Sequence, residues 1–132
     1  MNTIKKLPDS ELEAMIAIWE SDEAISGARI AEILQTRKGW SQSTVFTLLV
    51  RLADKGYISC VKQGKSNFYA PLIAEDEYRI SESQTVLDRF YAGSLKNFLA
   101  GFCGSKTLST EDLAALRRFV DEKSAEDDKS EL

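Results

Sequence analysis

The spacing of apolar residues changes from a helical period to a strand period near residue 57, and this change restricts the fold more than any other feature of the chain. Earlier segments place apolar side chains three and four residues apart, as helices with one buried face do. Residues 57–62 and 68–71 read as two short strands, and residues 63–67 form the turn between them. This order predicts a mostly α-helical domain in which three helices precede a small two-stranded β-hairpin.

Polar residues indicate where the first helix begins. Ser10 and Glu13 form the S-x-x-E pattern of a capping box, so we expect the helix to start near Ser10. Its acidic residues Glu11, Glu13 and Glu20 are expected on the solvated side. The opposite face should be buried, and it carries Leu12, Met15, Ile16 and Trp19.

The next two helices have clear start and stop signals. A short strand at residues 24–25 precedes Ser26, which is expected to cap the second helix. Ser41 or Ser43 should cap the third helix, and Gly56 occupies the position of a terminating glycine. The buried stripe of this third helix consists of Val45, Leu48, Leu49 and Leu52.

The third helix lies in GWSQSTVFTLLVRLADKGY, residues 39–57, and its other face carries hydroxyl groups, a phenylalanine and an arginine. In a winged helix-turn-helix this helix enters the DNA major groove. Short hydroxyl side chains allow close approach, apolar groups can touch thymine methyls, and cations can lie on phosphates. The candidate DNA-binding residues are Ser41, Ser43, Thr44, Phe46, Thr47, Arg51, Lys62 and Lys65.

The charge distribution favours nucleic acid in spite of a net charge of −4. Residues 37–67 contain six basic side chains and one acidic side chain, whereas residues 73–132 contain eight basic and thirteen acidic ones. The chain has no histidine, no phosphate-binding loop and no paired cysteine motif, so we expect neither an enzyme nor a metal or cofactor site. Its two cysteines, Cys60 and Cys103, are expected to be reduced and mostly buried.

From Ala74 the chain returns to helix, with a break near Gly93 and a final helix capped by Ser109 or Thr110. The apolar edge of these helices is too wide to bury within one small chain, so we expect a homodimer; the alternative is that these helices fold back on the first domain. The expected dimerisation residues are Val86, Leu87, Phe90, Tyr91, Leu95, Phe98, Leu99, Leu113, Leu116 and Phe119. The expected domains are a DNA-binding domain over residues 1–72, a dimerisation domain over residues 73–122 and a charged, disordered tail over residues 123–132.

Five segments resemble the penicillinase repressor family of bacteria, the BlaI/MecI type. They are LPDSELEAMIAIWE, STVFTLLVRLADKGYI, VKQGKSNFYAPLIAEDEY, LDRFYAGSLKNFLAGF and LSTEDLAALRRFVDE. The resemblance implies a cytoplasmic, homodimeric winged-helix repressor that binds palindromic operator DNA. By position, Thr44, Thr47 and Arg51 match recognition-helix residues of the family, and Tyr69 matches its wing tyrosine, a further DNA-binding candidate.

The chain departs from the well-known members in two places. Ser43 and Phe46 stand where those members carry basic residues, so the operator sequence is expected to differ. In the beta-lactam branch, a membrane metalloprotease receptor triggers cleavage just before a phenylalanine. The matching bond here is Gly101–Phe102, with glycine in place of asparagine, and a plain end of a dimer-core helix explains it equally well. The cysteine cluster of the copper-responsive branch is reduced to Cys103, so copper sensing is not expected.

Two other functions are considered beside the repressor. Net acidity and an exposed Phe46 would also suit a winged-helix module that binds proteins without DNA, and Phe46 could instead tuck against the wing. An enzyme or metal sensor is the weakest reading because histidine is absent. The N-terminus does not read as a secretory signal, and no apolar run approaches the length of a membrane span, so a cytoplasmic location is expected.

Overall fold

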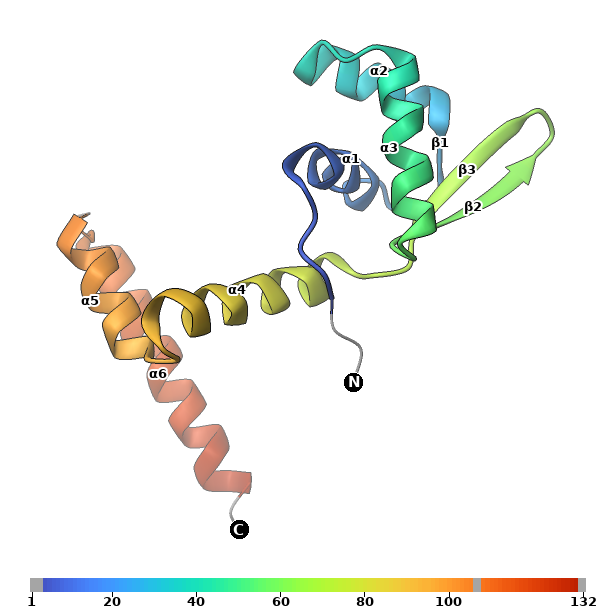
Figure 1. Ribbon diagram of the computed structural model, residues 1–132. Helices are drawn as coiled ribbons and strands as arrows, with labels where there is room; N and C mark the ends of the chain where they lie inside the picture. Colours follow the sequence, from blue (N-terminus) through green and yellow to red (C-terminus); the bar gives the residue numbers. More distant parts are fainter. Residues whose placement is uncertain (1–3, 106–107, 131–132) are drawn as a thin grey trace. The chain divides into compact units, whose positions relative to one another are not determined.

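The computed structural model describes residues 4–105 and 108–130. The chain divides into two compact units, and the boundary along the sequence lies between Thr85 and Val86. The first unit contains α1 (Asp9–Trp19), β1 (Ile25–Ser26), α2 (Gly27–Lys38), α3 (Gln42–Asp54), β2 (Ile58–Gln63) and β3 (Ser66–Pro71). The helix α4 (Glu75–Tyr91) begins in this unit and ends in the next. The described elements confirm the predicted order of three helices and a hairpin (Figure 1).

One hydrophobic core holds the three helices and the sheet of the first unit together. The predicted stripe of α3 is fully buried, as are most apolar residues of α1 and α2. Burial of each such side chain stabilises the unit by roughly 1.5–3 kcal/mol relative to exposure. The largest side chains of this core that are completely buried are Leu7, Met15, Ile18, Ile30, Leu34, Val45, Leu49 and Leu52.

The helix ends of α2 and α3 agree with the predicted caps. Ser26 accepts a hydrogen bond from the Arg29 backbone N–H at 3.1 Å, and Ser41 accepts one from Thr44 at 3.3 Å. Gly56 has a φ of 82°, which a residue with a side chain adopts only under strain. Its N–H and that of the following Tyr57 donate to carbonyls of the last turn of α3, so Gly56 terminates the helix as predicted.

Helix α1 begins at Asp9, next to the predicted start at Ser10, but the predicted capping box was wrong. Pro8 is the N-cap, no side chain caps the helix, and Ser10 lies inside it. Pro8 has a φ of −57°, and its carbonyl accepts the Leu12 N–H at 2.9 Å. The proline ring restricts φ to a value that suits a helix start, so the helix begins at Asp9, one residue before Ser10. The capping box therefore does not form.

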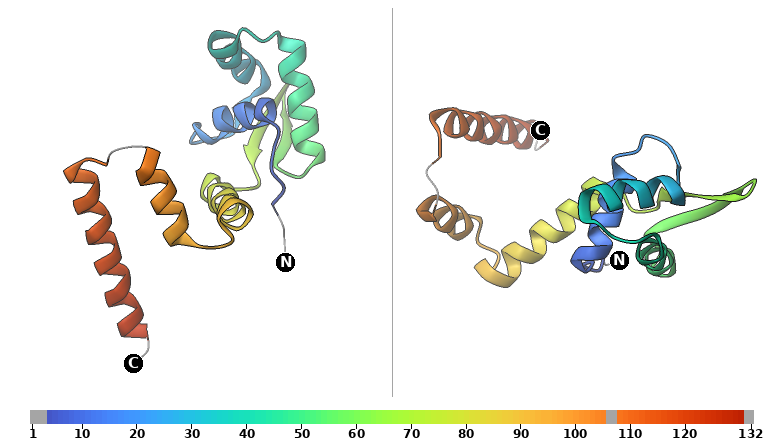
Figure 2. Two further views of the ribbon diagram at one scale, coloured as in Figure 1. Left: turned by 60° about the vertical axis from the view of Figure 1, so that its left-hand side comes forward. Right: turned by 90° about the horizontal axis from the view of Figure 1, so that it is seen from above.

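The wing contains one strand more than the predicted hairpin. Strands β2 and β3 pair antiparallel around a two-residue turn, with Cys60 opposite Tyr69, and β1 pairs with the other edge of β3. The strand order β1-β3-β2 fastens the base of the hairpin to the start of α2. Beyond that base, β2 and β3 project past the helices as a ribbon (Figures 1 and 2).

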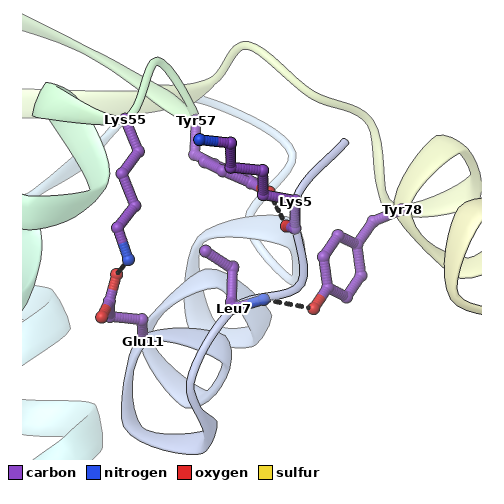
Figure 3. Close-up of polar contacts among 6 residues, drawn as sticks. All are labelled: Lys5, Leu7, Glu11, Lys55, Tyr57 and Tyr78. Atoms are coloured by element: carbon purple, nitrogen blue, oxygen red, sulfur yellow. Dashed lines mark hydrogen bonds and ion pairs between the residues drawn. The ribbon is translucent and has the colours of Figure 1, made fainter. Parts of the chain in front are cut away.

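Glu11 is buried, although we predicted that it would be solvated. Its carboxylate pairs with the Lys55 ammonium at 2.5 Å, and 4% of the Glu11 side chain is exposed against 41% of the Lys55 side chain (Figure 3). The ion pair explains why the prediction was wrong, because a carboxylate can be buried when a cation is paired with it. Lys55 is the C-cap of α3, so this ion pair ties α1 to the end of the third helix.

Aromatic side chains fasten the N-terminal segment and the start of α4 to the first unit. The Tyr57 hydroxyl donates to the Lys5 carbonyl, and the Leu7 N–H donates to the Tyr78 hydroxyl oxygen at 3.0 Å (Figure 3). The Trp19 indole N–H donates to the Ile73 carbonyl at 2.9 Å. Because these bonds join α1, the end of α3 and the first turn of α4, the beginning of α4 is part of the first unit rather than a free linker.

The second unit contains the end of α4, α5 (Leu95–Ser105) and α6 (Thr110–Ser130). Ala92 and Gly93 both have positive φ and break the helix where we predicted a break. Ser109 caps α6 by accepting the Asp112 N–H at 3.0 Å, as predicted. Within this unit the Tyr91 and Phe98 rings pack edge to face, with their centroids 5.4 Å apart.

Two predictions for this part of the chain require correction. Helix α6 continues to Ser130, so most of the expected disordered tail is helical, and residues 131–132 lie outside the described residues. The tail is rich in helix formers, and Lys123 pairs with Glu126 one turn later. Cys60 and Cys103 are free thiols as predicted, but both are exposed. No helix within residues 4–105 and 108–130 is long and apolar enough to cross a bilayer.

Candidate nucleic-acid interface

The two faces of α3 are cleanly separated. The apolar stripe is packed against the core, so the opposite face is turned outward along the length of the helix. Every candidate that we predicted on this helix is exposed. These residues are Ser41, Ser43, Thr44, Phe46, Thr47 and Arg51.

Hydroxyl groups gather at the N-terminal end of this face. The Ser41 oxygen lies 3.2 Å from the Ser43 hydroxyl and 3.0 Å from the Thr44 hydroxyl. The Thr47 hydroxyl donates to the Ser43 carbonyl at 3.0 Å. Thr47 therefore uses its proton inside the helix, and its oxygen lone pairs remain available to accept hydrogen bonds from a ligand.

Half of the basic residues between Arg37 and Asn67 are neutralised within the first unit. Arg37 pairs with Glu20 at 2.6 Å and Lys38 with Glu13 at 3.5 Å, in addition to the Lys55–Glu11 pair. The hydrogen bond to Glu20 raises the pKa of Arg37 and keeps it charged. Part of the positive charge counted along the sequence is thus neutralised by carboxylates in and directly after α1.

The other three basic residues are the free cations of this region. Among the residues that the structure describes, no ion pair involves Arg51, Lys62 or Lys65. Arg51 is on the outer face of α3, Lys65 is in the hairpin turn, and Lys62 lies opposite Asn67 in the wing. An exposed cation with no internal carboxylate can meet a phosphate without first breaking a salt bridge.

Tyr69 differs from the other candidates because it is buried. It is 9% exposed and forms part of the core, between its partners Ile25 on β1 and Cys60 on β2. Burial raises the pKa of its hydroxyl, and the neighbouring Cys60 thiol raises it further. This environment favours a role for Tyr69 in holding the wing against the helices.

Phe46 is partly exposed, and one edge of its ring packs against Gly27. It is 39% exposed. Its Cε1 atom would lie 3.1 Å from a Cβ placed at Gly27, and Tyr69 Cε2 would lie 3.3 Å from the same position. One edge of the ring therefore rests where α2 begins beside the wing. Both ideas drawn from the sequence, an exposed ring and a ring tucked against the wing, describe part of the arrangement.

Sequence reasoning missed Gly27 and the internal ion pairs. A glycine in the first turn of a helix, where it weakens the helix, was a signal that a neighbour approaches closely there. The ion pairs had no comparable signal, because the partners in Arg37–Glu20 and Lys55–Glu11 are far apart in the sequence.

The second unit presents large apolar side chains to solvent, and Phe90 is 70% exposed. Leu87, Tyr91, Phe98 and Leu99 are half-buried, and the other predicted dimerisation residues are exposed. Gly101 and Phe102 lie inside α5, so the matching peptide bond is helical. The described part of the chain holds no cluster of three or more metal-ligating side chains.

Comparisons with known proteins agree with this arrangement. A family profile described as penicillinase repressor matches residues 7–122. The chain is 34% identical over 122 residues to the penicillinase repressor of Bacillus licheniformis, covering 92% of this chain and 94% of that protein. It is 30% identical over 122 residues to the methicillin resistance regulatory protein MecI of Staphylococcus aureus (strain N315), covering 92% and 98%.

A solved structure extends the likeness to the fold. The Bacillus licheniformis BlaI monomer in complex with the blaP half-operator superposes with a TM-score of 0.51 at 35% identity, covering 59% of this chain and 94% of that chain. The profile match and the two relatives span nearly the whole sequence. This chain therefore belongs to the penicillinase repressor family.

Proposed function

We propose that this protein is a transcriptional repressor that acts as a homodimer on palindromic operator DNA. The observation that carries the proposal is the outward face of α3, which joins hydroxyl groups to the unpaired Arg51 in a chain of the penicillinase repressor family. The half-operator complex of the related BlaI supports the choice of DNA as ligand. The family consists of regulators, so no catalytic residues are assigned.

In this proposal α3 lies in the major groove and the wing follows the neighbouring backbone. Thr44, Thr47 and Ser43 approach base edges and phosphates, because their side chains are short and can accept hydrogen bonds. Arg51, Lys62 and Lys65 bind phosphates and release counterions. Binding should therefore weaken steeply as the salt concentration rises.

Dimerisation through the second unit explains its exposed apolar side chains. A monomer that left Phe90, Leu95 and Phe119 in water would carry an unusually large apolar surface. A two-fold axis would place two copies of α3 roughly 34 Å apart, which is one turn of DNA. A palindromic operator would match that symmetry.

Relief of repression by cleavage at Gly101–Phe102 is part of the proposal, carried by the family resemblance. The bond lies within α5, and a protease needs an extended substrate, so α5 would have to open locally before cleavage. Mass spectrometry of the protein from induced cells would give a fragment ending at Gly101 if the bond is cut. A chain that stays intact during induction would remove this part of the proposal.

The decisive experiment is a fluorescence anisotropy titration with a duplex that the protein selects from a randomised library. Arg51→Gln should weaken binding about tenfold and lower the salt dependence by roughly one counterion. Arg37→Gln is the matched control, because it removes the same charge from a residue that is paired with Glu20. Equal losses for both variants would mean that net charge, rather than the face of α3, accounts for binding.

The competing function is a winged-helix module that binds a protein partner, favoured by the partly exposed Phe46. In that case the library would yield no duplex that saturates the protein. Phe46→Ala would then abolish capture of the partner. Saturable binding that resists scrambled competitor DNA would exclude this function as the main one.

A further inference from the structure

Gly27 lies where α2, α3 and the wing meet, and a side chain there would press on two aromatic rings. It is buried, and a Cβ at this position would come within 3.1 Å of the Phe46 ring and 3.3 Å of the Tyr69 ring. Such distances are shorter than ordinary van der Waals contact between carbon atoms. The described glycines with positive φ are Gly39, Gly56, Gly64 and Gly93. The backbone therefore does not require glycine at position 27, whereas a Cβ there would force a neighbouring ring to shift by a few tenths of an ångström.

We infer that Gly27 and Tyr69 form a seat that sets the Phe46 ring on the DNA-facing side of α3, and that this seating makes the protein prefer thymine at one base pair of its operator. The inference rests on the proposed function and names the part of the operator that this site reads. Gly27 is a positioning residue, because it acts through Phe46. Phe46 is the residue that meets the base.

Of the two rings at the seat, Phe46 is the one that can move. Tyr69 is a core residue on the central strand β3, paired on one side with Ile25 and on the other with Cys60. Phe46 is 39% exposed on the outer face of α3. A methyl group added at Gly27 would therefore displace the Phe46 ring and leave Tyr69 in place.

Thymine is the base that an apolar ring edge can distinguish in the major groove. It alone presents a methyl group there, whereas the other bases present hydrogen-bond donors and acceptors. The neighbours of Phe46 on the outer face, Ser43 and Thr47, supply hydroxyl groups, so the ring adds an apolar surface beside them. Its fixed edge gives that methyl group a surface of defined position.

Uracil provides a direct probe, because it differs from thymine by the methyl group alone. The parent protein selects a duplex from a randomised library, and each thymine of that duplex is replaced singly by deoxyuridine. Anisotropy titrations then give the affinity for each replacement. At one thymine of the half-site the replacement should weaken binding by the parent about fourfold, as expected when the burial of one methyl group is lost. Phe46→Ala should show no loss at that position.

The variant Gly27→Ala tests the seat. It should reduce the uracil penalty below about twofold, and in the Phe46→Ala background it should change nothing further, since residues that act together are not additive. Val50→Ala is the matched control, because it truncates another exposed apolar residue of α3. No atom of Val50 is among the three nearest to a Cβ placed at Gly27. Val50→Ala should keep the full penalty at the same thymine.

Thermal unfolding of each variant separates a lost contact from a lost fold. If Gly27→Ala does not fold, the double variant with Phe46→Ala should fold again, because the ring that clashes at 3.1 Å is gone. A double variant that stays unfolded would overturn the inference. So would a parent that binds its duplex saturably with no thymine at which Phe46 matters, and that result would leave the repressor function standing. A parent that selects no duplex would instead refute the proposed function.

Discussion

The hydroxyl oxygen of Tyr78 accepts a hydrogen bond from the Leu7 backbone N–H at 3.0 Å, across 71 positions of the sequence. Both residues are buried, and the Tyr78 ring also meets Trp19 and Tyr57 with centroid distances of 5.7 Å and 6.3 Å. This contact fixes the first turn of α4 to the helices of the first unit. The start of α4 is therefore held by the same packed core that orients α3.

Tyr78→Phe should lower the free energy of unfolding of the first unit by about 1–2 kcal/mol, because it leaves the buried Leu7 N–H without an acceptor. Both tryptophans, Trp19 and Trp40, lie in this unit, so urea unfolding followed by tryptophan fluorescence measures it selectively. Tyr91→Phe, a change of the same kind in the second unit, is the control. A loss no larger than that of the control would mean that the bond contributes little.

Stability of the first unit should fall at alkaline pH. Burial raises the pKa of Tyr57 and of Tyr78 above the ordinary value of 10.0. The unfolded chain therefore loses these protons at a lower pH than the folded chain does. The stabilisation is complete below the unfolded pKa and is lost as the pH rises through the folded pKa. A variant that lacks one of these hydroxyl groups isolates the tyrosine contribution to the pH dependence.

The variant for that comparison is Tyr78→Phe, which removes one titrating hydroxyl and leaves every lysine in place. Its free energy of unfolding should decline less steeply than that of the parent between about pH 9 and pH 11, where tyrosine titrates. Urea titrations at several pH values give both slopes. Parallel slopes would show that Tyr78 does not contribute to the alkaline loss.

The Glu11–Lys55 pair should respond unequally to removal of either charge. Lys55→Met leaves Glu11 charged and buried, and should cost about 2 kcal/mol. Glu11→Gln leaves a lysine that is 41% exposed and can be hydrated, so it should cost about 1 kcal/mol or less. Urea unfolding of the two variants gives the order. A larger loss for Glu11→Gln would show that the pair does not depend on the burial of the carboxylate.

Removal of an exposed aromatic residue from the second unit should separate dimerisation from DNA recognition. Phe90→Ser should shift the protein from dimer to monomer in analytical ultracentrifugation, because a large apolar contact leaves the interface. Affinity for a palindromic site should fall more than about tenfold, while affinity for a half-site should be unchanged. Arg89→Ser, at the neighbouring exposed position, should leave the dimer intact. A Phe90→Ser protein that remains dimeric would place the interface elsewhere.

The sequence by itself determined the elements whose signals are local. The cap at Ser26, a cap at either Ser41 or Ser43, the stop at Gly56, and the buried stripe of α3 each depend on residues within one or two turns of each other. The exposed face of α3 followed from that stripe, because a helix that buries one face turns the other outward. Pattern reasoning therefore reached most of the candidate interface before any tertiary contact was known.

Only the tertiary structure decided which residues at that interface are free and which are held. Glu11 is buried because Lys55 meets it, and Lys55 is not available to DNA for the same reason. The Phe46 ring rests on Gly27, which belongs to another helix, and the Tyr78 hydroxyl depends on Leu7. These relationships join positions far apart in the chain. Their partners are fixed when the core packs, and packing distances leave no periodic signal in the sequence.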